Sequence, residues 1–132
     1  MPTLEDLPSD AEFERLMAEY TDAWNREDVD AIESYYSYPF FSFKEGQLEV
    51  YVDPTTGREI DLEWIAVNRR EGPAAWERLS SSIQHLGRNC VLVTTHWSFT
   101  RPDGSAVWDF VDTFQLCRFG NAWKFLSRTV HD

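Results

Sequence analysis

The sequence lacks several features that mark common protein classes. None of its apolar runs approaches the roughly 18 residues that a membrane-spanning helix needs, and it has only two cysteines. Cys90 and Cys117 are too few and too far apart for a disulfide framework or a zinc site, so we expect two reduced thiols. No basic leader precedes an apolar stretch. We therefore expect a single cytoplasmic domain over residues 1–132, without a membrane partner.

Basic residues are also scarce. Lysine and arginine together number 12, against 23 aspartates and glutamates, for a net charge of -11. A nucleic acid or an anionic membrane must be met by a basic surface, so neither is expected as a partner. The imbalance is greatest in residues 1–43, which hold eleven acidic and two basic residues. We expect this acidic part to form a solvated outer face.

The common catalytic motifs are missing as well. No serine or cysteine lies in a nucleophile motif, and no glycine-rich phosphate loop follows a predicted strand. The three histidines do not have metal-ligand spacing with a carboxylate. Kinase, hydrolase and metalloenzyme functions are therefore disfavoured, and neither a metal nor a cofactor is expected.

Helical periodicity is clear in the first third of the chain. Residues 9–26 start with Ser9 and Glu12, a capping-box pattern, and continue with large apolar residues at helical spacing. A second, shorter helix is predicted from Asp28 as its N-cap. The residues that share its apolar face are Val29, Ile32 and Tyr36.

The rest of the chain has mainly strand patterns. "PFFSF" and "QLEVYV" form a predicted hairpin around Gly46, and "DPTTG" breaks it. "EIDLEWIAVNRRE" is ambiguous: Ile60 and Leu62 would suit a hairpin, but the spacing of Leu62, Ile65, Ala66 and Arg69 favours a helix. Four strands are predicted in the last fifty residues. The order α, α, β, β, α, β, β, β, β is typical of an α+β fold.

The strand "AVWDFVDTFQLCR" holds two aspartates on opposite faces. A tight turn at residues 102–104 would set Val93 opposite Asp112, among aromatic residues. The same register sets His96 opposite Asp109 as an outer surface pair. A buried carboxyl must be paired, hydrogen-bonded or protonated, and burial raises its pKa. Asp112 is thus either a functional acid or a satisfied core residue.

The quoted helices, with "SSIQHLG" and "HWSFTRPDGSAVWDFVDTFQLCRFGNAWKFLSRTV", resemble the nuclear transport factor 2-like superfamily. SnoaL-like polyketide cyclases, ketosteroid isomerases and scytalone dehydratase belong to it. The resemblance covers nearly the whole chain and rests on spacing rather than on a catalytic string. It implies a cone-shaped fold, with a curved antiparallel sheet packed on N-terminal helices around a pocket, and usually a homodimer.

The similarity to ketosteroid isomerase is partial. The pocket tyrosine of that enzyme falls on Tyr20, and its buried acid falls on Asp112. Its base would fall near Phe43 or Lys44, where only Glu45 offers a carboxylate. Isomerase activity of that type is therefore not implied, whereas proton donation by Asp112 with help from Tyr20 is kept as a hypothesis.

The candidate catalytic residues are Asp112 as proton donor or oxyanion partner, Tyr20 as a second hydrogen-bond donor, and His85 as a base. A cone-shaped pocket would be lined by large rings with polar tips. The candidate substrate-binding residues are Trp24, Tyr36, Trp97, Trp108, Phe110 and Arg128.

Whether Arg128 lies opposite Asp112 depends on the length of one turn. A two-residue turn at Gly120 and Asn121, which turn chemistry favours, puts Arg128 opposite Thr113 and away from Asp112. A three-residue loop would put Arg128 directly opposite Asp112.

Two functions remain open at this point. The first is a cofactor-independent acid/base isomerase, cyclase or dehydratase that acts on a small apolar or aromatic substrate. The second is a noncatalytic ligand-binding module or accessory subunit of the same fold. A homodimer is expected through the outer face of the sheet. That face carries His96, Ser98, Val107, Val111 and Thr113.

Overall fold

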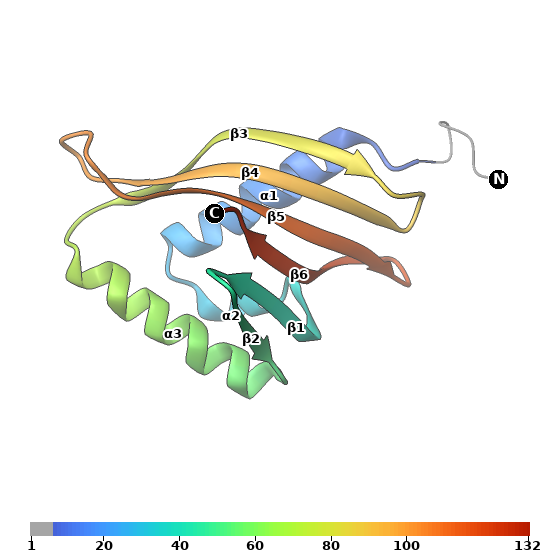
Figure 1. The fold of residues 1–132 in the computed structure, drawn as a ribbon, viewed down its shortest axis with the longest axis horizontal. Coiled ribbons are helices and arrows are strands. Elements are labelled where there is room, and N and C mark those ends of the chain that lie inside the picture. The colour runs from blue at the N-terminus through green and yellow to red at the C-terminus, as the bar shows by residue number, and fades with distance from the viewer. Residues whose placement is uncertain (1–6) are drawn as a thin grey trace.

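The structure is a computed structural model that describes residues 7–132. The described residues form three helices and six strands (Figure 1), and the predicted α+β class is confirmed. In chain order they are α1 (Asp10–Asn25), α2 (Val29–Glu33), β1 (Tyr36–Lys44), β2 (Gln47–Tyr51), α3 (Pro54–Arg70), β3 (Ala75–His85), β4 (Cys90–Thr100), β5 (Ala106–Phe119) and β6 (Ala122–Val130). None of the helices described is long and apolar enough to cross a membrane.

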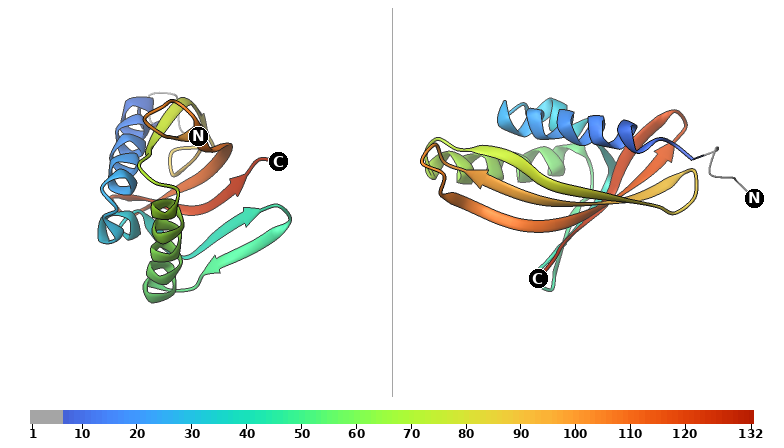
Figure 2. Two further views of the ribbon diagram at one scale, coloured as in Figure 1. Left: turned by 90° about the vertical axis from the view of Figure 1, so that its left-hand side faces the viewer. Right: turned by 90° about the horizontal axis from the view of Figure 1, so that it is seen from above.

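The strands form one curved sheet in the order β2-β1-β6-β5-β4-β3. Figure 2 shows that the helices lie on one face of this sheet. Neighbouring strands are antiparallel, as predicted for the sheet, except β1 and β6, which are parallel. No turn joins β1 to β6, because α3 and four strands lie between them in the sequence. A turn therefore does not impose the antiparallel direction here.

Helix α1 buries one apolar face against the sheet. Phe13, Met17, Tyr20 and Ala23 are buried at helical spacing, as the periodicity predicted. Ser9 occupies the N-cap, but its side chain makes no capping hydrogen bond. The predicted capping box is therefore not formed, and packing rather than capping stabilises this helix.

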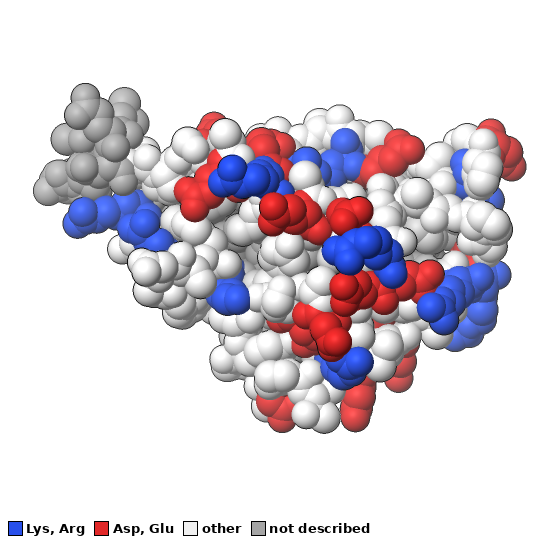
Figure 3. Space-filling view, turned by 180° about the vertical axis from the view of Figure 1, so that it is seen from behind, with Lys and Arg blue, Asp and Glu red and all other residues white. Residues whose placement is uncertain are grey.

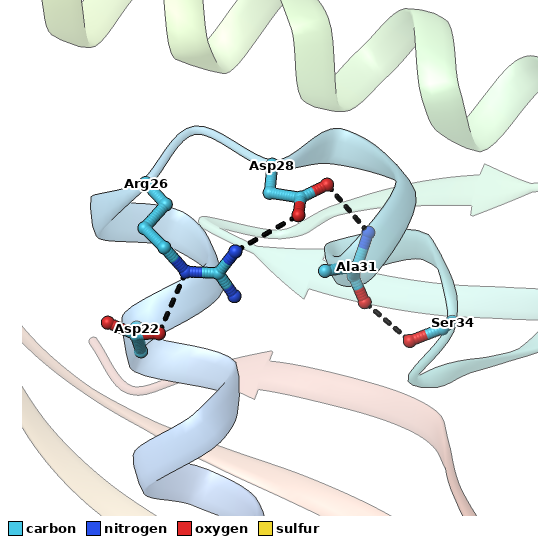
Figure 4. Close-up of polar contacts among 5 residues, drawn as sticks. All are labelled: Asp22, Arg26, Asp28, Ala31 and Ser34. Atoms are coloured by element: carbon cyan, nitrogen blue, oxygen red, sulfur yellow. Dashed lines mark hydrogen bonds and ion pairs between the residues drawn. The ribbon is translucent and has the colours of Figure 1, made fainter.

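Helix α2 is held by its caps, as Figure 4 shows. The Asp28 side chain accepts a hydrogen bond from the backbone N–H of Ala31 at 3.1 Å, as predicted. Arg26 joins the two helices, with Nε 2.8 Å from Asp22 and Nη1 3.1 Å from Asp28. The Ser34 hydroxyl donates to the carbonyl of Ala31 at 2.6 Å. This short helix is thus defined at both ends by side chains.

Two predicted boundaries need correction. Tyr36 was expected on the apolar face of the second helix, but α2 ends at Glu33 and Tyr36 opens β1. The "DPTTG" segment ends β2 as expected but also begins α3, because Asp53 caps the helix by accepting from the Thr56 N–H at 2.8 Å and proline suits the first helical turn. Tyr36 remains buried in the core.

Helix α3 confirms the helical reading of "EIDLEWIAVNRRE" but turns a different face to the sheet. Leu62, which was assigned to the apolar face, is 45% exposed. The buried residues of α3 are Gly57, Asp61, Ile65 and Asn68. Two polar side chains therefore point toward the interior, which the apolar pattern alone did not indicate.

The β4–β5 pairing keeps the predicted faces with a different register. Asp112 lies opposite Thr95 rather than opposite Val93. The loop is one residue tighter than expected, since the N–H of Arg101 bonds to the carbonyl of Ser105 at 2.8 Å, and a bulge beyond it adds a second shift. Two shifts of one residue restore the original alternation of faces.

Acidic and basic residues are interspersed on the surface. Figure 3 shows acidic and basic side chains lying together on the helical side of the molecule. Arg58, Arg69 and Arg78 pair with Asp30, Glu27 and Glu14, respectively. The acidic N-terminal third is therefore partly neutralised by arginines from later elements. Each exposed pair contributes little to stability, typically less than ~1 kcal/mol.

Candidate functional site

A cavity of about 140 Å³ lies between the helices and the sheet. Every helix and strand except α2 contributes to its walls. Most of the lining side chains are aromatic, and few are charged. The lining residues are Tyr20, Trp24, Tyr36, Phe40, Lys44, Tyr51, Asp61, Trp64, Asn68, Trp76, Trp97, Trp108, Phe110, Asp112, Phe114 and Arg128.

All the residues proposed from the sequence line this cavity except His85. Tyr20 and Tyr36 meet at its inner wall, with their hydroxyl oxygens 2.9 Å apart. Burial raises the pKa of both tyrosines, so both hydroxyls are neutral at physiological pH. One hydroxyl donates to the other, so the pair keeps one proton to donate to a ligand, and donation by Tyr20 stays a prediction.

His85 lies outside the cavity, which contradicts its assignment as a base near Asp112. Its Nε2 is 2.8 Å from Oδ1 of Asp10, and its ring packs edge-on against Phe13. The reason is its position in β3. Trp76, near the start of this strand, lines the cavity, and His85 follows nine residues later, about 30 Å further along an extended chain.

Asp112 is held by two donors. Trp97 Nε1 donates to Oδ1 at 2.8 Å, and Arg128 Nε donates to Oδ2 at 2.8 Å. Burial raises the pKa of Asp112, and the charge of Arg128 opposes this rise. A protonated carboxyl would need an acceptor, whereas both partners are donors. The geometry therefore fits an ionised carboxylate and argues against Asp112 as the proton donor.

A bulge resolves the two alternatives for Arg128. The favoured two-residue turn does form, with Phe119 opposite Ala122. A shift of register between Gln115 and Leu116 then sets Arg128 opposite Phe114, which shares a face with Asp112. Arg128 therefore reaches Asp112 without the three-residue loop, and turn chemistry alone could not have indicated this.

Asp61 of α3 is the main site residue that sequence reasoning missed. It is 1% exposed, and burial, together with neighbouring Glu33, raises its pKa to about 9. Oδ2 of Asp61 and Oε1 of Glu33 are both buried without a hydrogen-bond partner among residues 7–132. One proton held between the two carboxyls, with Asp61 as its carrier, satisfies both atoms.

Glu33 connects Asp61 to the outside of the molecule. Its Oε2 accepts a hydrogen bond from the hydroxyl of Tyr38, and its side chain is only half-buried. Burial also raises the pKa of Glu33, but the hydrogen bond that Glu33 accepts from Asp61 opposes this rise. The pair thus consists of an inner protonated carboxyl at the cavity and an outer carboxylate near solvent.

A signal for Asp61 was present in the sequence. Asp61 lies four residues before Ile65, and Asn68 lies three residues after Ile65. All three residues therefore share one helical face. Choosing Ile65 and its polar neighbours as the buried face would have placed Asp61 inside. The apolar Leu62 favoured the wrong face.

The profile of a family described as NTF2-like proteins (DUF6841) matches residues 11–132. The chain belongs to this NTF2-like family. No curated protein matches the sequence.

Solved structures share the fold at low sequence identity. An NTF2-like protein of unknown function from Pseudomonas putida superposes with a TM-score of 0.76 at 15% identity, over 92% of this chain and 84% of that one. A cystatin-like protein of unknown function from Nostoc punctiforme gives 0.75 at 10% identity, over 94% and 92%. A Novosphingobium aromaticivorans protein, provisionally named an aromatic ring hydroxylase, gives 0.72 at 18% identity, over 98% and 90%.

The net charge of the residues that line this NTF2-like cavity is opposite in sign to the net charge of the whole chain. Lys44 and Arg128 are cationic, Asp112 is anionic, and Asp61 is neutral at pH 7 because of its raised pKa. The lining is therefore net positive within a chain of net charge -11. Lys44 also lies 5.5 Å from the centre of the Trp64 ring, which is within cation–π range.

Metal binding is not supported by the arrangement of ligands. Within residues 7–132, no group of three His, Cys, Asp or Glu side chains could hold a metal ion. Cys90 and Cys117 are free and lie directly opposite each other in β4 and β5, with sulfur atoms 3.6 Å apart.

Proposed function

We propose that this NTF2-like protein binds a small cyclic or aromatic molecule in the cavity and acts on it by cofactor-independent acid/base chemistry. The reaction would be an isomerisation, cyclisation or dehydration. The observation that carries the proposal is the Asp61–Glu33 carboxyl pair at the wall of an otherwise aromatic cavity. Two carboxyls that share a proton can supply both an acid and a base.

The roles follow from position. Asp61 lines the cavity and holds its proton at neutral pH, so it donates to a substrate atom and accepts a proton back. Glu33, on the solvent side, exchanges that proton with water. The hydrogen-bonded pair of Tyr20 and Tyr36 offers one neutral hydroxyl donor to a developing negative charge. Asp112 holds Arg128 in place rather than donating a proton.

Hydrogen exchange on 2-cyclohexen-1-one in D₂O tests this proposal. This one-ring ketone exchanges protons next to its carbonyl only by acid/base catalysis, and NMR measures the deuterium gained. We expect the wild type to exceed the buffer rate at least tenfold and Asp61→Asn to return to it. Glu59→Gln is the matched control, because Glu59 is an exposed carboxyl residue of the same helix.

A noncatalytic binding role is the second candidate, and the saturation of Asp112 by Trp97 and Arg128 favours it. Binding of the ketone, seen as quenching of tryptophan fluorescence, without faster exchange would support this alternative. Exchange that persists in Asp61→Asn would contradict the assigned acid.

A further inference from the structure

Arg128 keeps part of its guanidinium free. Only Nε contacts Asp112, and within residues 7–132 the guanidinium forms no other hydrogen bond to the protein. The Arg128 side chain is 26% exposed, whereas Asp112 is 2% exposed. Because Arg128 lines the cavity, its Nη1–Nη2 edge is available to a bound molecule. That edge has the fork of parallel N–H donors that matches a carboxylate.

Asp112 also fixes the direction of this fork. The Nε–Asp112 bond of 2.8 Å sets one edge of the planar group, and the centre of the guanidinium lies 5.3 Å from the centre of the Phe110 ring. A guanidinium held on one edge and one face loses little further freedom when its other edge binds a ligand.

The surrounding groups carry little negative charge. Burial raises the pKa values of Tyr20, Tyr36 and Tyr51, so these hydroxyls stay neutral. Each oxygen of Asp112 already accepts a hydrogen bond. Two cations and one anion remain in the lining, so an anionic ligand completes the charge balance that the cavity lacks.

The size of the cavity limits the rest of the ligand. Its volume of about 140 Å³ is close to that of engineered cavities of roughly 150 Å³ that accept a single benzene. Aromatic side chains form most of its walls, which suits a flat ring. One six-membered ring with a small polar substituent fits this space.

We infer that the cavity takes a carboxylate carried on a single six-membered ring, with the carboxylate on the Nη edge of Arg128 and the charge of Lys44 nearby. The inference rests on the proposed function, since it names the substrate class of the same site.

Calorimetric titration with benzoate, benzamide and benzyl alcohol at pH 7 tests the inference. The three probes share one ring and differ in charge and in hydrogen-bonding groups. We expect benzoate to bind the wild type at least tenfold more tightly than either neutral compound, and quenching of the cavity tryptophans to follow the same order.

Variants identify the group that recognises the charge. We expect Arg128→Lys, which keeps the charge but loses the fork, to weaken benzoate about tenfold, and Lys44→Met to weaken it by a few fold. Arg88→Met, at an exposed turn, is the control and should leave affinity unchanged. The double variant Asp112→Asn/Arg128→Met avoids an unpaired buried charge, and in it benzoate should lose its advantage over benzamide.

The outcomes separate this inference from the proposed function. Equal binding of benzoate and benzamide, or a benzoate preference that survives in the folded double variant, overturns the carboxylate class and leaves the small-molecule site in place. If none of the three compounds binds, the site itself is wrong. Benzoate selectivity without exchange on the ketone supports the ligand class and overturns the catalytic role.

Discussion

Two buried aspartates in one cavity take opposite protonation states, and their neighbours explain why. Asp112 accepts from an indole N–H and from a guanidinium, both of which stabilise an anion. Asp61 faces another carboxyl, Glu33, and burial keeps it protonated. Burial raises the pKa of both aspartates. The hydrogen-bond donors around each carboxyl, rather than how deeply it is buried, therefore decide its protonation state. Asp61 rather than Asp112 is therefore the proton donor that we propose.

The protonation of Asp61 makes stability depend on pH. The pKa of Asp61 is about 9 in the folded protein, whereas an unperturbed aspartate has a pKa of 3.8. Between these values the native state binds one more proton than the unfolded chain, so the free energy of unfolding falls as pH rises, by up to about 1.4 kcal/mol per pH unit. This stabilisation is complete below about pH 4 and is lost as pH approaches 9.

Asp61→Asn removes this dependence, because the amide can still donate to Glu33 but does not titrate. We expect the variant to be more stable than the wild type by about 1 to 3 kcal/mol at pH 7, with a flatter pH profile. Urea denaturation from pH 5 to 8 measures both quantities, with Glu59→Gln as the surface control. A variant that is less stable at pH 8 and keeps the wild-type slope would show that Asp61 is ionised.

At the scale of elements, the cap of α2 gives the most direct test of local stability. Asp28→Ala removes the acceptor for the Ala31 N–H and one contact of Arg26. We expect a loss of about 1 kcal/mol in the free energy of unfolding. Asp22→Ala removes only the other contact of Arg26, which as a helical i,i+4 pair contributes roughly 0.3–0.5 kcal/mol.

The difference between these two variants isolates the cap from the ion pair. Equal losses in Asp28→Ala and Asp22→Ala would mean that the cap hydrogen bond contributes nothing. Chemical denaturation at low and high salt adds a check, because salt screens the ion pair more than the cap.

Element types could be predicted from this sequence, but registers and buried polar faces could not. Helical and alternating periodicities depend on the side chains of one segment, which is why α1 and the strand pattern of β5 were assigned correctly. The bulge that aims Arg128 at Asp112 depends on how β5 and β6 pack together. Asp61 was missed for a related reason, since an apolar pattern ranks Leu62 above a carboxyl that is buried only because Glu33 and the cavity surround it.

At the scale of the whole molecule, the fold leaves one sheet face without helices. Figure 2 shows the helices on a single side of the curved sheet, and residues of both the helices and the sheet line the cavity. The opposite face holds the pair of His96 Nε2 and Asp109 Oδ1 at 2.7 Å, which was predicted as a surface pair. Phe41 and Phe43 on β1 add exposed rings, 37% and 43% exposed.

We propose that this open face pairs with a second copy of the chain. A two-fold interface must be self-complementary, and a face of half-buried residues such as Val111 and Thr113, beside exposed rings, suits that requirement. Light scattering at micromolar concentration should therefore give twice the chain mass of 15.5 kDa. We expect Val111→Arg to give the single-chain mass, because the new charge would be placed within the proposed interface, whereas Leu86→Arg in the β3–β4 turn should remain dimeric. A wild-type protein with the mass of one chain, or a Val111→Arg variant that stays dimeric, would contradict this interface.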